Sequence, residues 1–563
     1  MTTATEAWFA ILISFAPFAC GDKGAASTAA DAGGASQSNA GSGGLSSAAA
    51  GSGGLSSAAA GSGGLSSAAA GSAGSPSVDA GTAGTSATSP FGACPASLPG
   101  APAARDCAYF RVPLLWNEAN GRAIDVLVAR YRVENARGQL WLLDGGPGGS
   151  GAQWMTPETM AIFLRYGFDV YVPQHRGTGH STPVDCSSPE SLGACSGELQ
   201  QLWGDGMRGF RSTEAGHDLA YLIDRTRASN EDVFVFGMSY GTYWAQRYLQ
   251  VAPVQATGVM LDGVLPLGFA PWEGDKGGDL VGRQVLELCG EDPDCLANMG
   301  DDPVAVAERV LNSARDPNLR CGGPGGPDFD TVSRTLTLTM AAGYFPFIPA
   351  ILRRLDRCSA SDQLELATAR GRAADVGAYQ GYGTDPADEY FSTSLSNNVF
   401  ALDFLGGLST AILEQKRSER AQLLFRAGGT TLEYIENVFL NWAVHAEPPV
   451  DTLPAKTSPL LLMNGSFDMS APLAWATSLA ERTAAPLVVF PGVGHRVDTT
   501  TARIEGVIPS CSMRIKEAFM RDPQATLDTS CASSVPPLDF NGKLDETRAT
   551  AEWLFGTPEM FPR

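Results

Sequence analysis

A serine between two glycines is the residue best placed for nucleophilic chemistry. Ser239 lies in Gly237-Met-Ser-Tyr-Gly241, after the apolar run 233–236 and before helix-forming residues that continue to Leu249. A strand that passes through Gly-x-Ser-x-Gly into a helix makes a sharp turn, which raises the serine hydroxyl above the edge of a sheet. The glycines permit that turn and the close packing of helix on strand. The bare motif is common by chance, but between a strand and a helix it predicts that Ser239 is a nucleophile.

A serine hydroxyl is a weak nucleophile, so it needs a base and a carboxylate that holds the base. The chain has five histidines, at 175, 180, 217, 445 and 495. His495 follows the last apolar run of the chain in a Gly-rich loop, and Asp468 follows the run before it. The order Ser239, Asp468, His495 is the chain order of α/β-hydrolases. We therefore predict that these three residues form a catalytic triad.

Simpler roles exist for the triad candidates. A single histidine is more often structural than catalytic. His495, however, lies in a loop after a strand and follows Ser239 and Asp468 in the expected order, which favours the catalytic role. Asp262, which follows another apolar run, is a weaker candidate for the acid. Its simpler role is to shape the turn before Gly263, because Asp and Gly are both frequent in turns.

Acyl transfer through a serine also needs N–H donors for the oxyanion. We expect one from the backbone of Tyr240, next to the nucleophile, and one from Gly146 in the loop Asp144-Gly-Gly-Pro-Gly-Gly-Ser-Gly151. That loop also contains a formal Gly-x-Gly-x-x-Gly, so a dinucleotide site is an alternative. Pro147 stiffens the loop and no acid is clearly placed to hold a ribose, which makes this alternative the weaker one. We expect no metal or organic cofactor.

Apolar runs that precede these residues indicate the strands that position them. Strands are expected at 123–133, 139–143, 168–172, 233–236, 259–261, 460–463 and 487–490. Helical stretches between several of them form the βαβ pattern of a mostly parallel sheet. The runs stop near 265 and resume near 459, and the interval is largely helical, at 302–315, 361–372, 408–425 and 431–446. The predicted fold class is α/β, an α/β-hydrolase fold with an inserted helical cap. The expected parts are 91–265 and 459–563 for the core and 266–458 for the cap.

The first 20 residues are expected to be a signal peptide. The apolar stretch 7–19 is too short to span a membrane but suits the core of a signal, although Glu6 and the absence of Lys and Arg make a poor start. Cys20 follows directly, as in a bacterial lipoprotein signal, and is a candidate for lipidation and membrane attachment. An ordinary cleaved signal is the alternative. The protein is therefore expected to be secreted or anchored to the cell envelope.

Residues 21–90 differ in composition from the rest of the chain. They are mostly Gly, Ala and Ser, and the decamer GSGGLSSAAA occurs three times in succession at 41–70. A ten-residue unit with one Leu cannot bury enough apolar surface to offset the entropy of ordering the chain. This segment is therefore expected to be a disordered linker.

Charge and cysteine content narrow the function classes further. The chain has 39 Lys and Arg against 60 Asp and Glu, a net charge of −21, which argues against nucleic acid and against docking on anionic lipid. Ten cysteines remain after Cys20, an even number that indicates disulfides in an exported chain. The natural sequential pairs are 94–107, 186–195, 289–295, 321–358 and 511–531. Zinc is the weaker alternative because no Cys-x-x-Cys is present.

Several motifs together resemble one branch of the α/β-hydrolases. They are GGPGGSG at 145–151, Arg176-Gly-Thr-Gly-His-Ser181, Gly237-Met-Ser-Tyr-Gly-Thr242, Leu261-Asp-Gly-Val264 and the pair Asp468 and His495. The chain is in these respects similar to secreted tripeptidyl and prolyl aminopeptidases. The resemblance spans about 109–531 and includes the Cys511 to Cys531 segment. It implies a capped serine peptidase that releases residues or short peptides from substrate N-termini through an acyl-enzyme.

Three positions depart from that family. Asp144 stands where the prolyl type has a His. Gln174-His175 precedes Arg176, where family members usually have an acid two residues before the Arg. The cap segment 433–442 lacks a cysteine that tripeptidyl relatives usually have nearby. These departures weaken the inference to a peptide substrate. The alternatives are a serine carboxylesterase that acts on small esters and, last, a non-catalytic binding scaffold displayed on a surface.

An aminopeptidase must also bind a free ammonium group, which calls for carboxylates near the nucleophile. Glu433 and Glu436 in the cap are the candidates for substrate binding, with Asp144 as a further one. For each of them, a solvated surface acid or a charge near the start of a helix is the more common role.

Overall fold

The computed structural model describes residues 90–98, 105–118, 120–187, 191–379, 391–426, 432–443, 451–498, 500–501 and 506–561. The expected signal peptide, Cys20 and the expected linker lie outside these residues, as does His445. Within the described part of the chain, every helix is too short or too polar to cross a membrane.

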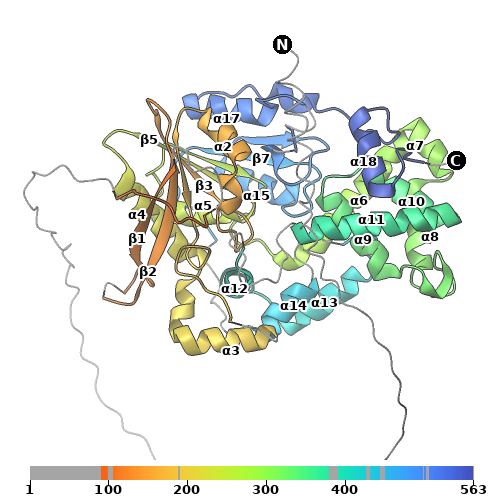
Figure 1. The fold of residues 1–563 in the computed structure, drawn as a ribbon, viewed down its shortest axis with the longest axis horizontal. Helices are drawn as coiled ribbons and strands as arrows, with labels where there is room; N and C mark the ends of the chain where they lie inside the picture. The colour runs from red at the N-terminus through yellow and green to blue at the C-terminus, as the bar shows by residue number, and fades with distance from the viewer. Residues whose placement is uncertain are drawn as a thin grey trace, which may run out of the picture. The chain divides into compact units, whose positions relative to one another are not determined.

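The described residues form an eight-stranded sheet (Figure 1). Its strands are β1 (Arg105–Pro113), β2 (Ala123–Tyr131), β3 (Gly138–Leu143), β4 (Asp169–Pro173), β5 (Asp232–Met238), β6 (Gly258–Asp262), β7 (Leu460–Gly465) and β8 (Leu487–Phe490). Their order is β1-β2-β4-β3-β5-β6-β7-β8, and every pairing from β4 to β8 is parallel, whereas β1·β2 and β2·β4 are antiparallel. The predicted α/β class is confirmed, and each expected strand is present.

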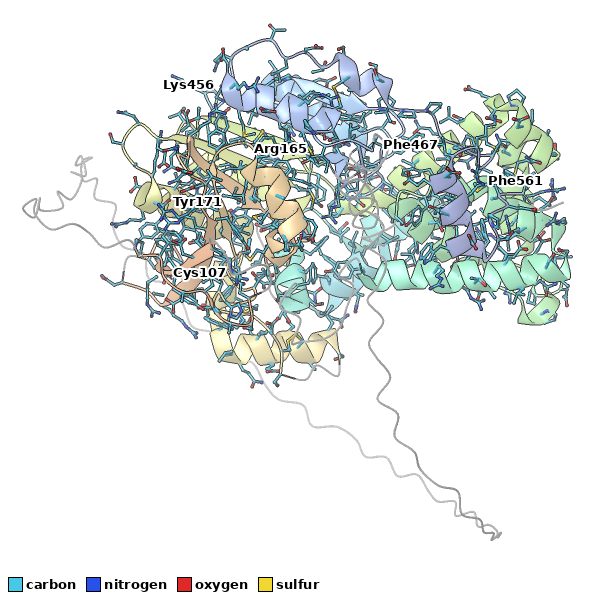
Figure 2. The ribbon with its side chains drawn as sticks, turned by 45° about the horizontal axis from the view of Figure 1, so that its top comes forward. Cys107, Arg165, Tyr171, Lys456, Phe467 and Phe561 are labelled. Atoms are coloured by element: carbon cyan, nitrogen blue, oxygen red, sulfur yellow. A yellow bond between two sulfur atoms is a disulfide. The ribbon has the colours of Figure 1, made fainter. Side chains whose placement is uncertain are left out.

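Helices cover both faces of the sheet, because alternate strand residues point to opposite sides. The helices outside the cap interval are α2 (Pro157–Leu164), α3 (Leu192–Trp203), α4 (Ser212–Thr226), α5 (Tyr240–Val251), α15 (Leu473–Thr483), α17 (Cys511–Arg521) and α18 (Asp545–Phe555). In β2, Val126 and Val128 join the apolar cluster of α4 and α5. Leu127 and Ala129 join the cluster of α2 and α17. Figure 2 shows Tyr171 of β4 and Cys107 of β1 within this sheet region.

Between β6 and β7, the described residues form helices and no strand. The α-helices are α6 (Gly274–Glu291), α7 (Pro293–Met299), α8 (Pro303–Ser313), α9 (Phe329–Ala341), α10 (Phe347–Arg357), α11 (Ala360–Tyr379), α12 (Thr393–Val399), α13 (Thr410–Arg420) and α14 (Leu432–Asn441). The helical insertion therefore interrupts the sheet where the apolar runs stop.

The C-terminal helix α18 packs with the insertion and not with the sheet. Leu554 and Phe555 share an apolar cluster with Leu286 and Ile351 of the cap helices, and Figure 1 shows α18 beside α10 and α11. The buried guanidinium of Arg354 in α10 donates to the carbonyl of Met560 at 2.6 Å. The expected boundary assigned the whole of 459–563 to the core. The structure differs for the last residues of the chain, because the apolar face of α18 packs into the interior of the cap. Figure 2 labels Phe561, which follows α18, beside the cap helices.

Disulfides join the expected sequential pairs within the described residues. They are Cys94–Cys107, Cys186–Cys195, Cys289–Cys295, Cys321–Cys358 and Cys511–Cys531. Cys94–Cys107 attaches the first described residues to β1, and Cys511–Cys531 joins the start of α17 to the segment that follows this helix.

A buried ion pair joins Arg176, in the loop after β4, to Asp218 of α4, and we expect it to contribute strongly to stability. Arg176 donates to Asp218 at 2.7 and 2.6 Å and to the carbonyls of Leu114 and Gly209, and its side chain is fully buried. Arg176→Ala leaves Asp218 buried without its cation, so we expect the free energy of unfolding in urea to fall by about 3–5 kcal/mol. Arg111→Ala, which breaks an exposed pair, should cost less than about 1 kcal/mol. Equal losses in the two variants would contradict this account.

Candidate active site

Ser239 lies in the turn that joins β5 to α5. Its backbone has φ 55° and ψ −124°, a conformation that residues other than glycine rarely adopt. A Cβ on Gly237 would lie 2.3 Å from the carbonyl oxygen of Gly241, so the turn has no room for a side chain at that position. The N–H of Ser239 donates to the carbonyl of Asp262 at the end of β6, at 2.9 Å. The neighbouring strand therefore holds this strained turn in place.

His495 and Asp468 meet in a direct hydrogen bond. Nδ1 of His495 lies 2.7 Å from Oδ2 of Asp468. The other oxygen of Asp468 accepts the N–H groups of Ser470 and Ala471, at 2.9 and 2.7 Å. The carboxylate is thus fixed and buried, whereas 18% of the His495 side chain stays exposed. With Nδ1 bound to Asp468, Nε2 is the ring nitrogen that can accept a proton from a nucleophile.

Burial alone would lower the pKa of His495, because it penalises the charged ring. The charge of Asp468 and the hydrogen bond that it makes outweigh burial, and the pKa of His495 is raised above its ordinary value. The site therefore favours the imidazolium that forms when the histidine takes a proton.

Parallel strands bring the three triad candidates to one edge of the sheet. Ser239 follows β5, Asp468 follows β7 and His495 follows β8, and these strands are neighbours with β6 between β5 and β7. Gly263, after β6, marks how tightly the loops pack: a Cβ there would lie 2.7 Å from Cε1 of His495 and 3.4 Å from Oδ2 of Asp468. On the other side, a Cβ on Gly145 would lie 3.1 Å from Cβ of Ser239.

Gly263→Ala should therefore displace His495. The new methyl group would overlap the imidazole, and the backbone at φ 67° disfavours any side chain. Because misplacement of a catalytic group by about 1 Å can cost about 10²-fold, we expect kcat/KM to fall by about that factor. Gly492→Ala, at a similar φ of 69° but with only Leu538 nearby, is the matched control. Similar losses of activity in both variants would show that packing on His495 is not the cause.

The glycine loop between β3 and the next helix is closed by Asp144. This buried carboxylate accepts the N–H of Gly145 at 2.7 Å, the N–H of Gly151 at 2.8 Å and the side-chain amide of Gln153. Burial raises the pKa of Asp144, and these donors oppose the rise. The side chain considered above for ammonium binding thus holds the loop together. Its structural role was not evident in the sequence, where the first and last residues of the loop stand seven positions apart.

The two predicted oxyanion donors are the backbone N–H groups of Gly146 and Tyr240. Among the described residues, no backbone hydrogen bond uses the N–H of Gly146 or of Tyr240. Tyr240 is the first residue of α5, and the N–H groups of a first helical turn have no partner within the helix. Their role as oxyanion donors stays a prediction. The cap also reaches the loop, because the N–H of Ser392 donates to the carbonyl of Gly148 at 2.9 Å.

His175 contacts the side chain of Tyr240, the residue after Ser239, a role that the sequence analysis did not predict. Its Nε2 lies 3.0 Å from the hydroxyl of Tyr240, its Nδ1 lies 2.7 Å from the carbonyl of Arg176, and its ring packs on Trp244. Burial lowers the pKa of His175 to about 4, so the ring is neutral at pH 7 and accepts the proton of Tyr240. The one signal in the sequence was that Gln174-His175 precedes Arg176, where related peptidases usually have an acid.

The cap acids Glu433 and Glu436 both lie on α14 and face α13. Glu433 forms an ion pair with Arg420, and its side chain is 60% exposed. Glu436 forms an ion pair with Arg417. Each carboxylate therefore already has a cation, and substrate binding by either residue stays a prediction.

Metal-ligating side chains do not gather in the described part of the chain, where no three His, Cys, Asp or Glu could hold an ion together. The ten described cysteines form disulfides and therefore offer no thiolate to a metal.

Two family models match the chain. Residues 140–277 match the α/β hydrolase fold family, and residues 433–531 match the TAP-like protein family. The first segment contains the glycine loop and Ser239, and the second contains Asp468, His495 and both cysteines of the last disulfide. No curated protein matches the chain.

Solved structures with low sequence identity also match. A thermophilic esterase from Thermogutta terrifontis is 14% identical, with 74% of this chain and 100% of that chain covered and a TM-score of 0.29. A bromoperoxidase from Bacillus anthracis is 14% identical, with coverage of 70% and 96% and a TM-score of 0.30. An esterase from Exiguobacterium antarcticum is 14% identical, with coverage of 72% and 97% and a TM-score of 0.31. At these scores the matches carry no argument about the substrate.

Proposed function

The chain is an α/β-hydrolase with a TAP-like C-terminal part, and from this premise we propose that it is an exported serine peptidase. It releases residues or short peptides from the N-termini of its substrates through an acyl-enzyme. The observation that carries the proposal is the hydrogen bond from His495 to Asp468 on the sheet edge where Ser239 stands in its strained turn. The TAP-like match and the aminopeptidase motifs favour peptides over other acyl substrates.

In the proposed reaction, each residue of the triad has one role. Oγ of Ser239 attacks the carbonyl carbon while Nε2 of His495 takes the hydroxyl proton, and Asp468 stabilises the imidazolium. The N–H groups of Gly146 and Tyr240 donate to the oxyanion. Collapse of the tetrahedral intermediate breaks the C–N bond, and His495 gives its proton to the leaving amine. Water then attacks the acyl-enzyme by the same route and restores Ser239.

Export is part of the proposal and is supported by the disulfides, which persist in oxidising surroundings. Membrane attachment through a lipidated Cys20 extends it. The net charge of −21 argues against nucleic acid as a partner.

A carboxylesterase is the second candidate, because the same groups cleave an ester more easily than an amide. The departures at Asp144 and Gln174-His175 favour it, since they separate this chain from the peptidases it otherwise resembles.

A substrate panel on the purified protein tests the choice. It compares aminoacyl and tripeptidyl amides with the same peptides blocked at the N-terminus and with short-chain nitrophenyl esters. We expect cleavage of the free-amine amides and loss of that cleavage on blocking. Ester turnover without amide cleavage would replace the peptidase by the esterase. Failure to cleave any member would favour the non-catalytic scaffold.

A further inference from the structure

Asp262, at the end of β6, touches both halves of the candidate site. Its backbone carbonyl accepts the N–H of Ser239 at 2.9 Å. Its carboxylate Oδ1 accepts the N–H of Val497, two residues after His495, at 3.2 Å. Only 1% of Asp262 is exposed. One rigid strand end therefore positions the turn of the nucleophile and the loop of the base together.

A buried lysine faces the same loop from α17. Lys516 is 1% exposed, forms an ion pair with Asp498 and lies 4.2 Å from the ring centre of Phe236. A lysine is almost never fully buried unless it is paired, because removing its charge from water is costly. Burial lowers the pKa of Lys516 and raises that of Asp262, and the attraction between the two opposes both shifts.

The charges around His495 come from four elements. Asp468 follows β7 and binds the ring directly, and Asp262 ends β6. Arg496 lies on the histidine loop itself, and its guanidinium donates to Gln153 at 3.3 Å. Asp498 lies further along the loop and is neutralised by Lys516 of α17. Asp262 is thus a second buried carboxylate beside the ring, and its charge adds to that of Asp468 in favouring the imidazolium.

We propose that Asp262 is a positioning residue for His495, and that Lys516 secures the same loop through its ion pair with Asp498. The carboxylate fixes the histidine loop through Val497 and supplies negative charge, and Lys516 holds the next residue of that loop. This inference rests on the proposed function. It differs from the triad in that Asp262 acts through the histidine loop and the turn of Ser239, without touching the substrate.

The test is Asp262→Asn in the full chain, which keeps an acceptor for the Val497 N–H and removes the charge. The readouts are kcat/KM for a short-chain nitrophenyl ester and the rate of labelling by a fluorophosphonate, both as functions of pH. Removing a negative charge lowers the pKa of His495, which must be neutral to act as a base. The acid limb of both profiles should therefore move to lower pH by about 1 unit. We also expect kcat/KM at the optimum to fall by about 10-fold.

The matched control is Asp362→Asn. Asp362 is equally buried, but it pairs with Arg357 in the cap, so its loss should reduce stability and leave the acid limb unchanged. Where Asp262→Asn does not fold, the triple variant Asp262→Asn, Lys516→Met, Asp498→Asn takes its place. It also removes the ion pair of Lys516 with Asp498, so one negative charge is lost in total and the same downward movement of the acid limb is expected.

The outcomes separate the inference from the proposed function. A wild-type protein that neither cleaves the ester nor reacts with the fluorophosphonate would defeat the proposed function. A wild-type protein that reacts, together with a folded Asp262→Asn variant whose acid limb is unchanged, would overturn the inference alone.

Discussion

Ser239→Ala is expected to lower kcat/KM by about 10⁵- to 10⁶-fold, because it removes the atom that attacks the substrate. The fold should survive, since the side chain of Ser239 makes no hydrogen bond that the turn needs; the backbone N–H donates to Asp262. The measurement is steady-state turnover of the best substrate in the panel, with circular dichroism to verify folding.

Ser333→Ala is the control for that variant. Ser333 is a serine of α9 that is 2% exposed, and its hydroxyl has no hydrogen-bond partner among the residues that the structure describes. Its loss should therefore leave kcat/KM close to the wild-type value. Turnover by Ser239→Ala at more than a thousandth of the wild-type rate would show that another group acts as the nucleophile.

Asp468→Asn is expected to lower kcat by about 10⁴-fold with little change in the fold. An asparagine amide can donate to Nδ1 of His495, which places the ring proton on Nε2, where the proton of Ser239 must be received. The residual activity should also extend to lower pH. Asp468 raises the pKa of His495, so that pKa falls when the negative charge is removed, and the neutral base persists at lower pH.

Pre-steady-state kinetics across pH values measure both effects. A variant that retains wild-type kcat, or whose acid limb moves to higher pH, would contradict the assignment of Asp468. Asp362→Asn serves as the control, because Asp362 is buried and paired with Arg357 in the cap.

The strands and the triad candidates could be predicted because their signals are local. The apolar run before Ser239 and the helix formers after it define a strand, a turn and a helix within 20 residues. His495 and Asp468 were found from their places after apolar runs. β1 was not among the expected strands, because Arg105, Asp106 and Arg111 interrupt its apolar pattern at the sheet edge.

The supporting residues could not be predicted, because they depend on contacts between distant segments. Lys516 lies in a helix of mixed polarity, where a lysine is normally exposed, and only its packing beneath the His495 loop reveals its burial. The pairing of Glu433 with Arg420 depends on how α14 meets α13. Likewise, the packing of α18 with the cap follows from an apolar face whose partner lies about 200 residues earlier in the chain.

Covalent labelling tests most directly that His495 and Asp468 activate Ser239. The purified chain is treated with a fluorophosphonate, its intact mass is measured, and the modified residue is identified by peptide mapping. We predict one adduct per chain, on the peptide that contains Ser239, absent from Ser239→Ala and formed far more slowly in Asp468→Asn. An adduct on a different residue, or a folded protein that forms none, would contradict the account.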